Sequence, residues 1–235
     1  MEKDDGELDP FQANTSYFLV EWQMFKGEPE RASALLGAAE KVRVDRVLDI
    51  GCGAGQEMLP FVEAGATGIG MDANPEAGII GRDMFAREKL SDRANFLVGT
   101  GNNLPFADQS FDVLICRVAL MYMDNKAALA EMSRTLRPGA ILFLKYHSPA
   151  YYGWKFVNGL REGYVKSAIH ASRVLCTGLV YHLTGKQFFG RLTAGGEIFQ
   201  TRRKLRRELA RVGLRFLEEM PDSNIQTPSF VIRKG

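Results

Sequence analysis

The chain has 235 residues, of which 46% are hydrophobic and 25% are charged, and this composition is typical of a soluble globular protein with a substantial core. Its formal net charge of +2 provides no overall attraction to nucleic acid, so any basic surface must be local. The three cysteines, Cys52, Cys116 and Cys176, stand far apart without a C-x-x-C pair. We therefore predict neither a disulfide framework nor a cysteine metal site, and we expect a cytoplasmic protein.

The N-terminal region begins with an acidic, polar segment, residues 1–10, which does not have the pattern of a signal peptide. We expect it to be a disordered tail, followed by a single domain over residues 11–235. Residues 11–26 carry aromatic side chains at helical spacing. The predicted helix either packs on the core or closes over a ligand, with Tyr17 or Trp22 facing the pocket.

A second helix is predicted over residues 31–41, which are rich in Ala and Leu. The next stretch, Val-Leu-Asp-Ile-Gly-Cys-Gly-Ala-Gly-Gln at residues 47–56, is the pattern of a buried strand that breaks into a tight turn before a helix. Its glycines permit unusual backbone dihedrals and the close approach of a ligand. Position 56 is Gln, so the turn lacks the third glycine of the G-x-G-x-x-G dinucleotide fingerprint.

A second predicted strand, residues 68–72, ends in the carboxylate of Asp72, about 20 residues after the first glycine of the turn. In nucleotide-binding folds an acidic residue at this distance holds a ribose hydroxyl pair. Asn74 and Pro75 then form a helix start, and residues 95–99 read as a third strand.

The glycine turn and the second carboxylate resemble the class I S-adenosylmethionine-dependent methyltransferases, in particular the small-molecule, methyltransferase type 11-like branch with the motif VLDIGCGxG. The resemblance extends from about residue 44 to residue 146. It implies a Rossmann-like sheet of seven mostly parallel strands with an antiparallel last strand and helices on both faces. It also implies methyl transfer from S-adenosyl-L-methionine, with S-adenosyl-L-homocysteine as the product. The cofactor-binding residues expected from the first two strands are Asp49, Gly51, Cys52, Gly53, Gly55, Asp72 and Ala73.

Residues 100–114 resemble the family segment G-D-A-x-x-L-P-F-x-D-x-S-F-D-x-V, in which the first Asp accepts a hydrogen bond from the adenine amino group. Thr100 stands at that position here. We therefore expect adenine to be recognised by backbone groups of the residues that follow, which are Gly101, Asn102 and Asn103.

The fourth strand is predicted over residues 111–116, and Arg117 and Tyr122 follow its carboxyl end, where open α/β sheets bind their ligands. We expect Arg117 to bind the cofactor and Tyr122 to face the acceptor. The chain lacks the Asn-Pro-Pro-Tyr and Pro-Cys motifs of base, amide and cytosine methylation. A helix capped by Asp124 and a fifth strand over residues 140–146 follow.

Residues 147–200 depart from the minimal family pattern, and insertions at this place form a lid over the methyl group in the family. The segment is rich in aromatic residues and holds all three histidines of the chain, without a metal-ligand spacing. His147 is our candidate general base, because a histidine accepts a proton near neutral pH. Tyr151 and Tyr152 are further catalytic candidates, and Glu197 is a substrate-binding candidate.

Residues 167–183 are mostly apolar and predicted to be helical, but they are too short and too interrupted to span a bilayer. Three interpretations remain open for this helix: a lid over the pocket, a dimer or lipid-surface contact, or an ordinary internal helix. A last helix over residues 201–212 carries many arginines outside its apolar stripe. Residues 214–220 and 229–233 are predicted to form an antiparallel hairpin.

The sequence thus predicts a methyltransferase that acts on a small, partly apolar acceptor through O, N or S, as a monomer or homodimer, without a metal. Three alternatives stay open. One is an RNA or protein methyltransferase that docks through the helix from Arg202 to Arg211, although nucleic acid is the less expected partner. The others are a non-catalytic S-adenosylmethionine-binding module and a nicotinamide oxidoreductase.

Overall fold

The computed structural model describes residues 10–235, with side chains from Tyr17 onward. The first nine residues of the predicted tail lie outside the described part, and Pro10, which we assigned to the tail, instead begins the first helix. The helices that precede and flank the first strands are α1 (Pro10–Lys26), α2 (Pro29–Ala39), α3 (Leu59–Glu63) and α4 (Pro75–Arg87).

The seven strands form one sheet in the order β3-β2-β1-β4-β5-β7-β6. They are β1 (Arg46–Ile50), β2 (Thr67–Asp72), β3 (Ala94–Val98), β4 (Phe111–Arg117), β5 (Leu136–Lys145), β6 (Leu214–Glu219) and β7 (Ser229–Lys234). The first five strands pair in parallel, and β7 lies antiparallel between β5 and β6. The predicted fold class and the predicted antiparallel hairpin are confirmed.

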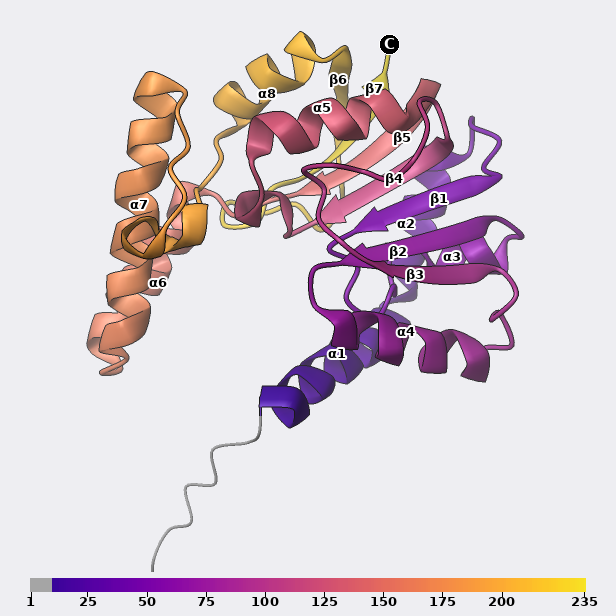
Figure 1. The fold of residues 1–235 in the computed structure, drawn as a ribbon, viewed down its shortest axis with the longest axis horizontal. Helices are drawn as coiled ribbons and strands as arrows, with labels where there is room; N and C mark the ends of the chain where they lie inside the picture. Colours follow the sequence, from indigo (N-terminus) through magenta and orange to yellow (C-terminus); the bar gives the residue numbers. More distant parts are fainter. Residues whose placement is uncertain (1–9) are drawn as a thin grey trace, which may run out of the picture.

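Alternation along the central strands builds a core on each face of the sheet. Val113 and Ile115 of β4 join the cluster that holds the apolar residues of α1 to α4. Leu114, between them, joins the opposite cluster, together with residues of α5 (Asn125–Thr135) and α8 (Arg202–Arg211). Successive strand residues point to opposite faces, so both faces are covered by helices. Figure 1 shows α5 and α8 on one side of the sheet and α1 and α4 on the other.

Local signals set several element boundaries. The Asn74 side chain accepts a hydrogen bond from Glu76 N at 3.0 Å and caps α4. Pro60 lies in the first turn of α3, where a proline is tolerated. One boundary was wrong: β5 begins at Leu136 rather than Ala140, because Leu136 pairs with Phe111 before a bulge in the ladder.

The segment after β5 forms a hairpin of two helices, α6 (Pro149–Arg161) and α7 (Val165–Thr184). These helices pack along each other and stand beside the sheet (Figure 1). The helix α7 confirms the helical prediction over residues 167–183, whereas α6 was not predicted as a separate helix. The short 3₁₀ helix η2 (Arg191–Gly196) follows. Within the described residues, no helix is long and apolar enough to cross a membrane.

Candidate active site

The glycine turn after β1 adopts a conformation that other residues avoid. Gly51 and Gly53 have φ of +68° and +54°, in the left-handed region. A Cβ on Gly51 would lie 2.3 Å from Cβ of Ala119, in the segment after β4, and the Gly51 N–H donates to the Met71 carbonyl at 2.7 Å. The turn is therefore held between β2 and the loop after β4, with its backbone at the carboxyl edge of the sheet.

A cavity of about 660 Å³ lies against this turn. Its lining combines charged, aromatic and backbone groups from the turn, from α1 and α2, from the ends of β4 and β5, and from the start of α6. The lining residues are Tyr17, Phe18, Glu21, Arg31, Asp49, Gly51, Cys52, Gly53, Gln56, Glu57, Asp72, Arg117, Val118, Tyr122, Lys145, His147, Tyr151 and Thr227.

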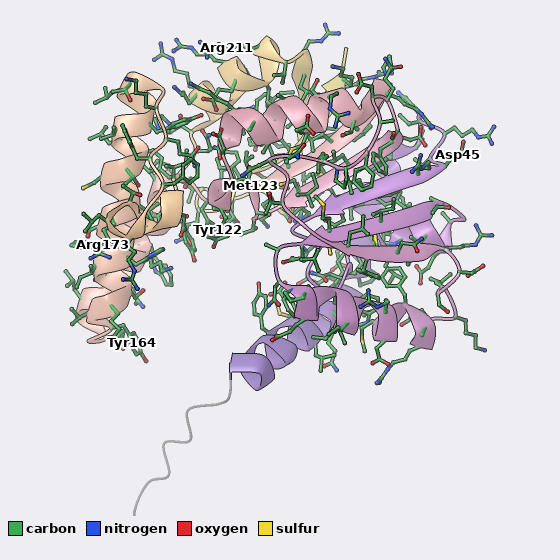
Figure 2. The ribbon with its side chains drawn as sticks, in the orientation of Figure 1. Asp45, Tyr122, Met123, Tyr164, Arg173 and Arg211 are labelled. Atoms are coloured by element: carbon green, nitrogen blue, oxygen red, sulfur yellow. The ribbon has the colours of Figure 1, made fainter. Side chains whose placement is uncertain are left out.

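A smaller cavity of about 230 Å³ adjoins the first and shares Gly51, Asp72, Val118 and Tyr122 with it. Its other lining residues are Ala73, Gly99, Thr100, Ala119 and Met123. Figure 2 shows Tyr122 and Met123 between the helical hairpin and the sheet. The two cavities together follow the carboxyl ends of β1, β2 and β4.

Asp49 places a buried carboxyl group in the wall of the large cavity. The residue is 2% exposed, and its Oδ2 has no hydrogen-bond partner among the described residues. Burial, followed by the nearby charges of Glu57 and Asp72, raises the pKa of Asp49 well above its usual value, although Arg117 and Arg31 oppose the shift. A buried acceptor without a partner is costly, so this atom is suited to a ligand that donates a hydrogen bond or carries positive charge.

Asp72 lines both cavities and is held by the backbone on each side. Its Oδ2 accepts from Gly53 N at 3.0 Å, and its Oδ1 accepts from Asn74 N at 2.9 Å. Each carboxylate oxygen accepts more than one hydrogen bond. Asp72 is therefore oriented by protein groups and retains the capacity to accept from two further donors.

A charged network lines the large cavity between these carboxylates and β5. Arg117 Nε donates to Glu57 Oε1 at 2.9 Å, and both side chains are almost fully buried. Arg117 also pairs with Asp222, which accepts from Lys145 Nζ at 2.8 Å, while Arg31 pairs with Glu57. Burial alone would raise the pKa of Asp222, but the Arg117 and Lys145 charges hold it well below its usual value. Glu57 Oε2 and Asp222 Oδ1 still lack partners among the described residues.

The opposite wall of the large cavity carries His147 and Tyr151. Their rings stack with centroids 3.7 Å apart. His147 Nδ1 lies 3.3 Å from the Tyr152 hydroxyl, and this hydroxyl donates to Glu197 Oε1 at 2.6 Å. Glu197 Oε2 lies 3.0 Å from His170 Nε2. The Tyr152 hydroxyl has one proton, which it donates to Glu197, so its oxygen accepts from a protonated Nδ1 of His147.

These hydrogen bonds determine which tautomer of the His147 ring lines the cavity. With Nδ1 protonated, the neutral ring keeps a lone pair on Nε2. Burial, followed by the Lys155 and Lys145 charges, lowers the pKa of His147 to about 4. The imidazole is therefore neutral at pH 7, with a free lone pair, and it is a weaker base than an exposed histidine.

Two of the predicted site residues, Gly55 and Trp22, do not line either cavity. Gly55 does not line either cavity, because its Cβ position lies 3.0 Å from Met58 and Phe96 in the core. Trp22 is also buried in the core, where its ring packs edge-on against Phe85 with centroids 5.5 Å apart. Both residues therefore stabilise the elements beneath the site rather than contact its contents.

The residues to which we assigned adenine recognition lie outside both cavities. Gly99 and Thr100 line the small cavity, but the predicted residues do not. Gly101 packs against Met123 and Ile50, and Asn102 Oδ1 accepts from Asp124 N at 3.0 Å. Asn103 is exposed outside both cavities.

The remaining predicted residues divide between the cavity and its supports. Tyr17, Tyr122 and Cys52 line the large cavity, and burial raises the pKa of the Cys52 thiol. Tyr152 and Glu197 lie behind His147, fully or almost fully buried, and do not line the cavity. No group of three or more His, Cys, Asp or Glu within the described residues could hold a metal ion.

Sequence reasoning missed Glu57, Arg31, Lys145 and Asp222, the partners of the buried network. Glu57 follows Gly55 by two residues and could have been found as part of the turn. Arg31 and Asp222 stand far from any motif. The packing of α2 brings Arg31 to the cavity, and the loop before β7 brings Asp222 to Arg117 and Lys145.

Comparison with known proteins finds methyltransferases that are similar to this chain. A sequence model described as a methyltransferase domain matches residues 48–144. An uncharacterized methyltransferase, YcgJ, from Bacillus subtilis is 34% identical over 142 residues, which are 60% of this chain and 55% of that protein. The chain spans between 31% and 57% of the length of the first curated relatives that it matches.

Solved structures are similar in fold. The crystal structure of YcgJ aligns with a TM-score of 0.61 and 18% identity, over 87% of this chain and 98% of that one. A geranyl diphosphate methyltransferase in complex with GPP and sinefungin aligns with a TM-score of 0.60 and 17% identity, over 88% and 76% of the two chains. At such identities the likeness concerns the fold alone.

Proposed function

Because this chain carries a class I S-adenosylmethionine-dependent methyltransferase domain, we propose that it transfers a methyl group from S-adenosylmethionine to a small, partly apolar acceptor. One observation carries the proposal. The large cavity is lined at once by the glycine turn of Gly51 and Gly53, by Asp49 and Asp72, and by His147.

The residues of the two cavities fit the cofactor. Its amino group donates hydrogen bonds and carries positive charge, which the unpartnered Oδ2 of Asp49 requires. Asp72, oriented by Gly53 and Asn74, would accept from the two ribose hydroxyls. Gly99 and Thr100 of the small cavity would flank adenine. Arg117 would contribute positive charge to the cavity wall near the methionine carboxylate, while it remains paired with Glu57.

The cofactor supplies a sulfonium-activated methyl group, so the protein mainly has to align the acceptor for in-line attack. Alignment of this kind supplies several kcal/mol of barrier reduction. Tyr17, Tyr122 and Tyr151 present aromatic surfaces to the cavity, which favours an acceptor with an apolar body. We assign no accepting atom among O, N and S.

His147 would accept the acceptor's proton where the acceptor arrives protonated. The Tyr152–Glu197 pair keeps Nδ1 protonated and leaves the Nε2 lone pair for this step. When the acceptor is methylated, its proton would be held on Nε2 of His147. Tyr152 and Glu197 are positioning residues in this scheme, and Tyr151 holds the imidazole plane by stacking.

The helical hairpin of α6 and α7 would act as the lid predicted for residues 147–200. Its first turn contributes Tyr151 to the cavity wall. A relative similar in fold is named for the methylation of geranyl diphosphate, and another relative, 35% identical over 105 residues, is named a sterol methyltransferase. These names support an acceptor with an apolar body.

The RNA or protein methyltransferase alternative is less well supported. Three cations of α8 lie over aromatic rings of the same chain: Arg202 over Phe230, Lys204 over Tyr181 and Arg206 over Phe216. Arg202 also pairs with Glu219. These contacts give the basic helix a role in packing.

Two measurements test the proposal. Calorimetry should show S-adenosylmethionine binding, and Asp72→Asn should weaken it by about 1–3 kcal/mol, the scale of losing charged hydrogen bonds. Asp83→Asn is the matched control and should bind S-adenosylmethionine normally. Asp83 is an exposed carboxylate on α4 that pairs with Arg87.

Incubation with isotopically labelled S-adenosylmethionine and cell extract, followed by mass spectrometry, should then reveal a labelled small molecule. Binding of NADH in place of S-adenosylmethionine would overturn the cofactor assignment. Label that appears only in RNA or protein would overturn the acceptor class.

A further inference from the structure

The side of α7 that faces away from the rest of the chain is mainly apolar, and its exposed polar residues are Lys166, Arg173 and Thr184. Its exposed residues Val165, Ile169, Cys176, Leu179, Val180 and Leu183 recur at spacings that place them on one face of a helix. Leu183 is 77% exposed, and Val165 and Leu179 are each 56% exposed. We call this set the outer face of α7.

The opposite side of α7 packs against other parts of the chain. Ala168 packs against Gly159 of α6, and Gly178 packs against the ring of Phe199. Tyr181 is buried and its hydroxyl bonds to Glu208 of α8. The helix therefore needs no apolar outer face in order to pack.

The surface helix α8 shows the ordinary arrangement. Its apolar residues Leu205 and Leu209 are buried, and its exposed positions are arginines and one alanine. A helix on the surface of a globular protein normally carries charged or polar residues outward. Helix α7 departs from this pattern, and contiguous exposed apolar surface of this kind marks a contact site.

The charges around the outer face indicate the partner. Residues 149–192 contain six Lys and Arg against one acidic residue, Glu162, while the rest of the chain contains 24 Lys and Arg against 27 Asp and Glu. Lys166, Arg173 and Lys186 form no ion pair with any side chain that the structure describes. In Figure 2, Arg173 extends from the hairpin on the side away from the sheet, and Tyr164 lies at its tip.

We propose that the outer face of α7, with Lys166 and Arg173 beside it, docks onto the surface of an anionic lipid bilayer. Apolar side chains flanked by Lys and Arg are the combination by which an amphipathic helix lies in the headgroup region. Acidic lipid headgroups attract the cations, and the apolar residues insert at the boundary of the acyl chains. The inference concerns binding alone and does not depend on methyl transfer.

A second copy of this chain is a less suitable occupant of the same face. A two-fold dimer would bring the same surface patch of each protomer together, so the unpaired cations beside α7 would face one another without an acidic residue on the helix to balance them. An anionic membrane supplies the opposite charge.

Co-sedimentation with vesicles tests the proposal. The full chain should bind vesicles of mixed phosphatidylcholine and phosphatidylserine, bind pure phosphatidylcholine vesicles more weakly, and lose affinity as salt increases. Leu183→Glu and the double change Lys166→Glu with Arg173→Glu should each reduce binding to the anionic vesicles by about tenfold or more. All three positions are exposed, so the variants should keep the wild-type melting temperature.

Ile79→Glu is the matched control, because Ile79 is a 54% exposed apolar residue on another helix, α4. It should bind vesicles as the wild type does. The proposal is overturned if the wild type fails to bind anionic vesicles at low salt, or if Leu183→Glu and Ile79→Glu bind equally. It is also overturned if sedimentation shows self-association that Leu183→Glu abolishes while lipid binding is absent, since the face would then join two copies of the chain.

Discussion

The Tyr152 hydroxyl donates to Glu197 Oε1 at 2.6 Å, between the first turn of α6 and the segment that follows η2. Both residues are buried, and His147 Nδ1 lies 3.3 Å from the same hydroxyl. The pair therefore sets the orientation of the cavity-lining imidazole from behind. In the proposed role of His147 as the base, its orientation depends on Tyr152 and Glu197, which do not line the cavity.

Replacing the candidate base should affect turnover without affecting cofactor binding. His147→Asn should reduce kcat by about 10²–10⁴-fold for an acceptor that arrives protonated, the usual contribution of general base catalysis, and leave S-adenosylmethionine affinity nearly unchanged. His182→Asn is the control, because His182 bonds to Gly178 and Thr201 away from the cavity. Full activity of His147→Asn across the pH range would remove it as the base.

The buried imidazole should also make stability depend on pH. The pKa of His147 falls from 6.5 to about 4 in the folded chain, first because of burial and then because of Lys155 and Lys145. Between these values the unfolded chain binds more protons, so the free energy of unfolding should decrease as pH falls from 6.5 toward 4. Denaturant titrations of wild type and His147→Asn check this, and an equal pH dependence in both proteins would contradict it.

Asp49→Asn should separate stability from binding. The substitution removes a buried carboxyl group, and the pKa of that group is raised by burial and by the nearby Glu57 and Asp72. We expect a higher melting temperature for the free protein, together with S-adenosylmethionine binding weaker by about 1–3 kcal/mol. Thermal unfolding with and without the cofactor measures both effects. A variant that loses stability would contradict the cost of the buried carboxyl group, and one that keeps its full cofactor affinity would show that Asp49 does not face the amino group.

The buried network should stabilise the fold far more than a surface pair does. Arg117→Met leaves the buried Glu57 and the partly buried Asp222 without their shared partner, and the free energy of unfolding should fall by about 3–5 kcal/mol. Arg87→Met breaks an exposed pair with Asp83 and should cost less than about 1 kcal/mol. Urea titrations compare the two variants, and similar losses in both would contradict a structural role for the network.

Two glycine substitutions should have opposite effects. Gly51→Ala places a Cβ at φ +68° and against Ala119, so strain of about 1–3 kcal/mol is expected even before the overlap is counted. Gly153 lies within α6 with nothing near its Cβ position, and Gly153→Ala should stabilise the chain by about 0.5–1 kcal/mol. Measured unfolding free energies check the pair. A Gly51→Ala variant as stable as the wild type would show that the turn has another conformation.

The order of elements could be read from the sequence because its determinants are local. Short, mostly apolar runs that end at turn residues predict the parallel strands, and Asn74 and Asp124 mark the start of the helices that they cap. The missed helix α6 had such a signal too, because the Ser148 side chain accepts from Ala150 N and Pro149 occupies the first turn. We interpreted that stretch as a lid from its aromatic composition and assigned no separate helix to it.

The sequence by itself determined the fold class and the two carboxylates that end β1 and β2, since short motifs within one strand-turn-helix unit specify both. Only the tertiary structure decided that Gly55 and Trp22 belong to the core, that Gly99 and Thr100 line the small cavity, and that Glu57 pairs with Arg117 across 60 residues. Such relationships join residues far apart in the chain. They depend on how helices pack against the sheet, and no local pattern records that packing.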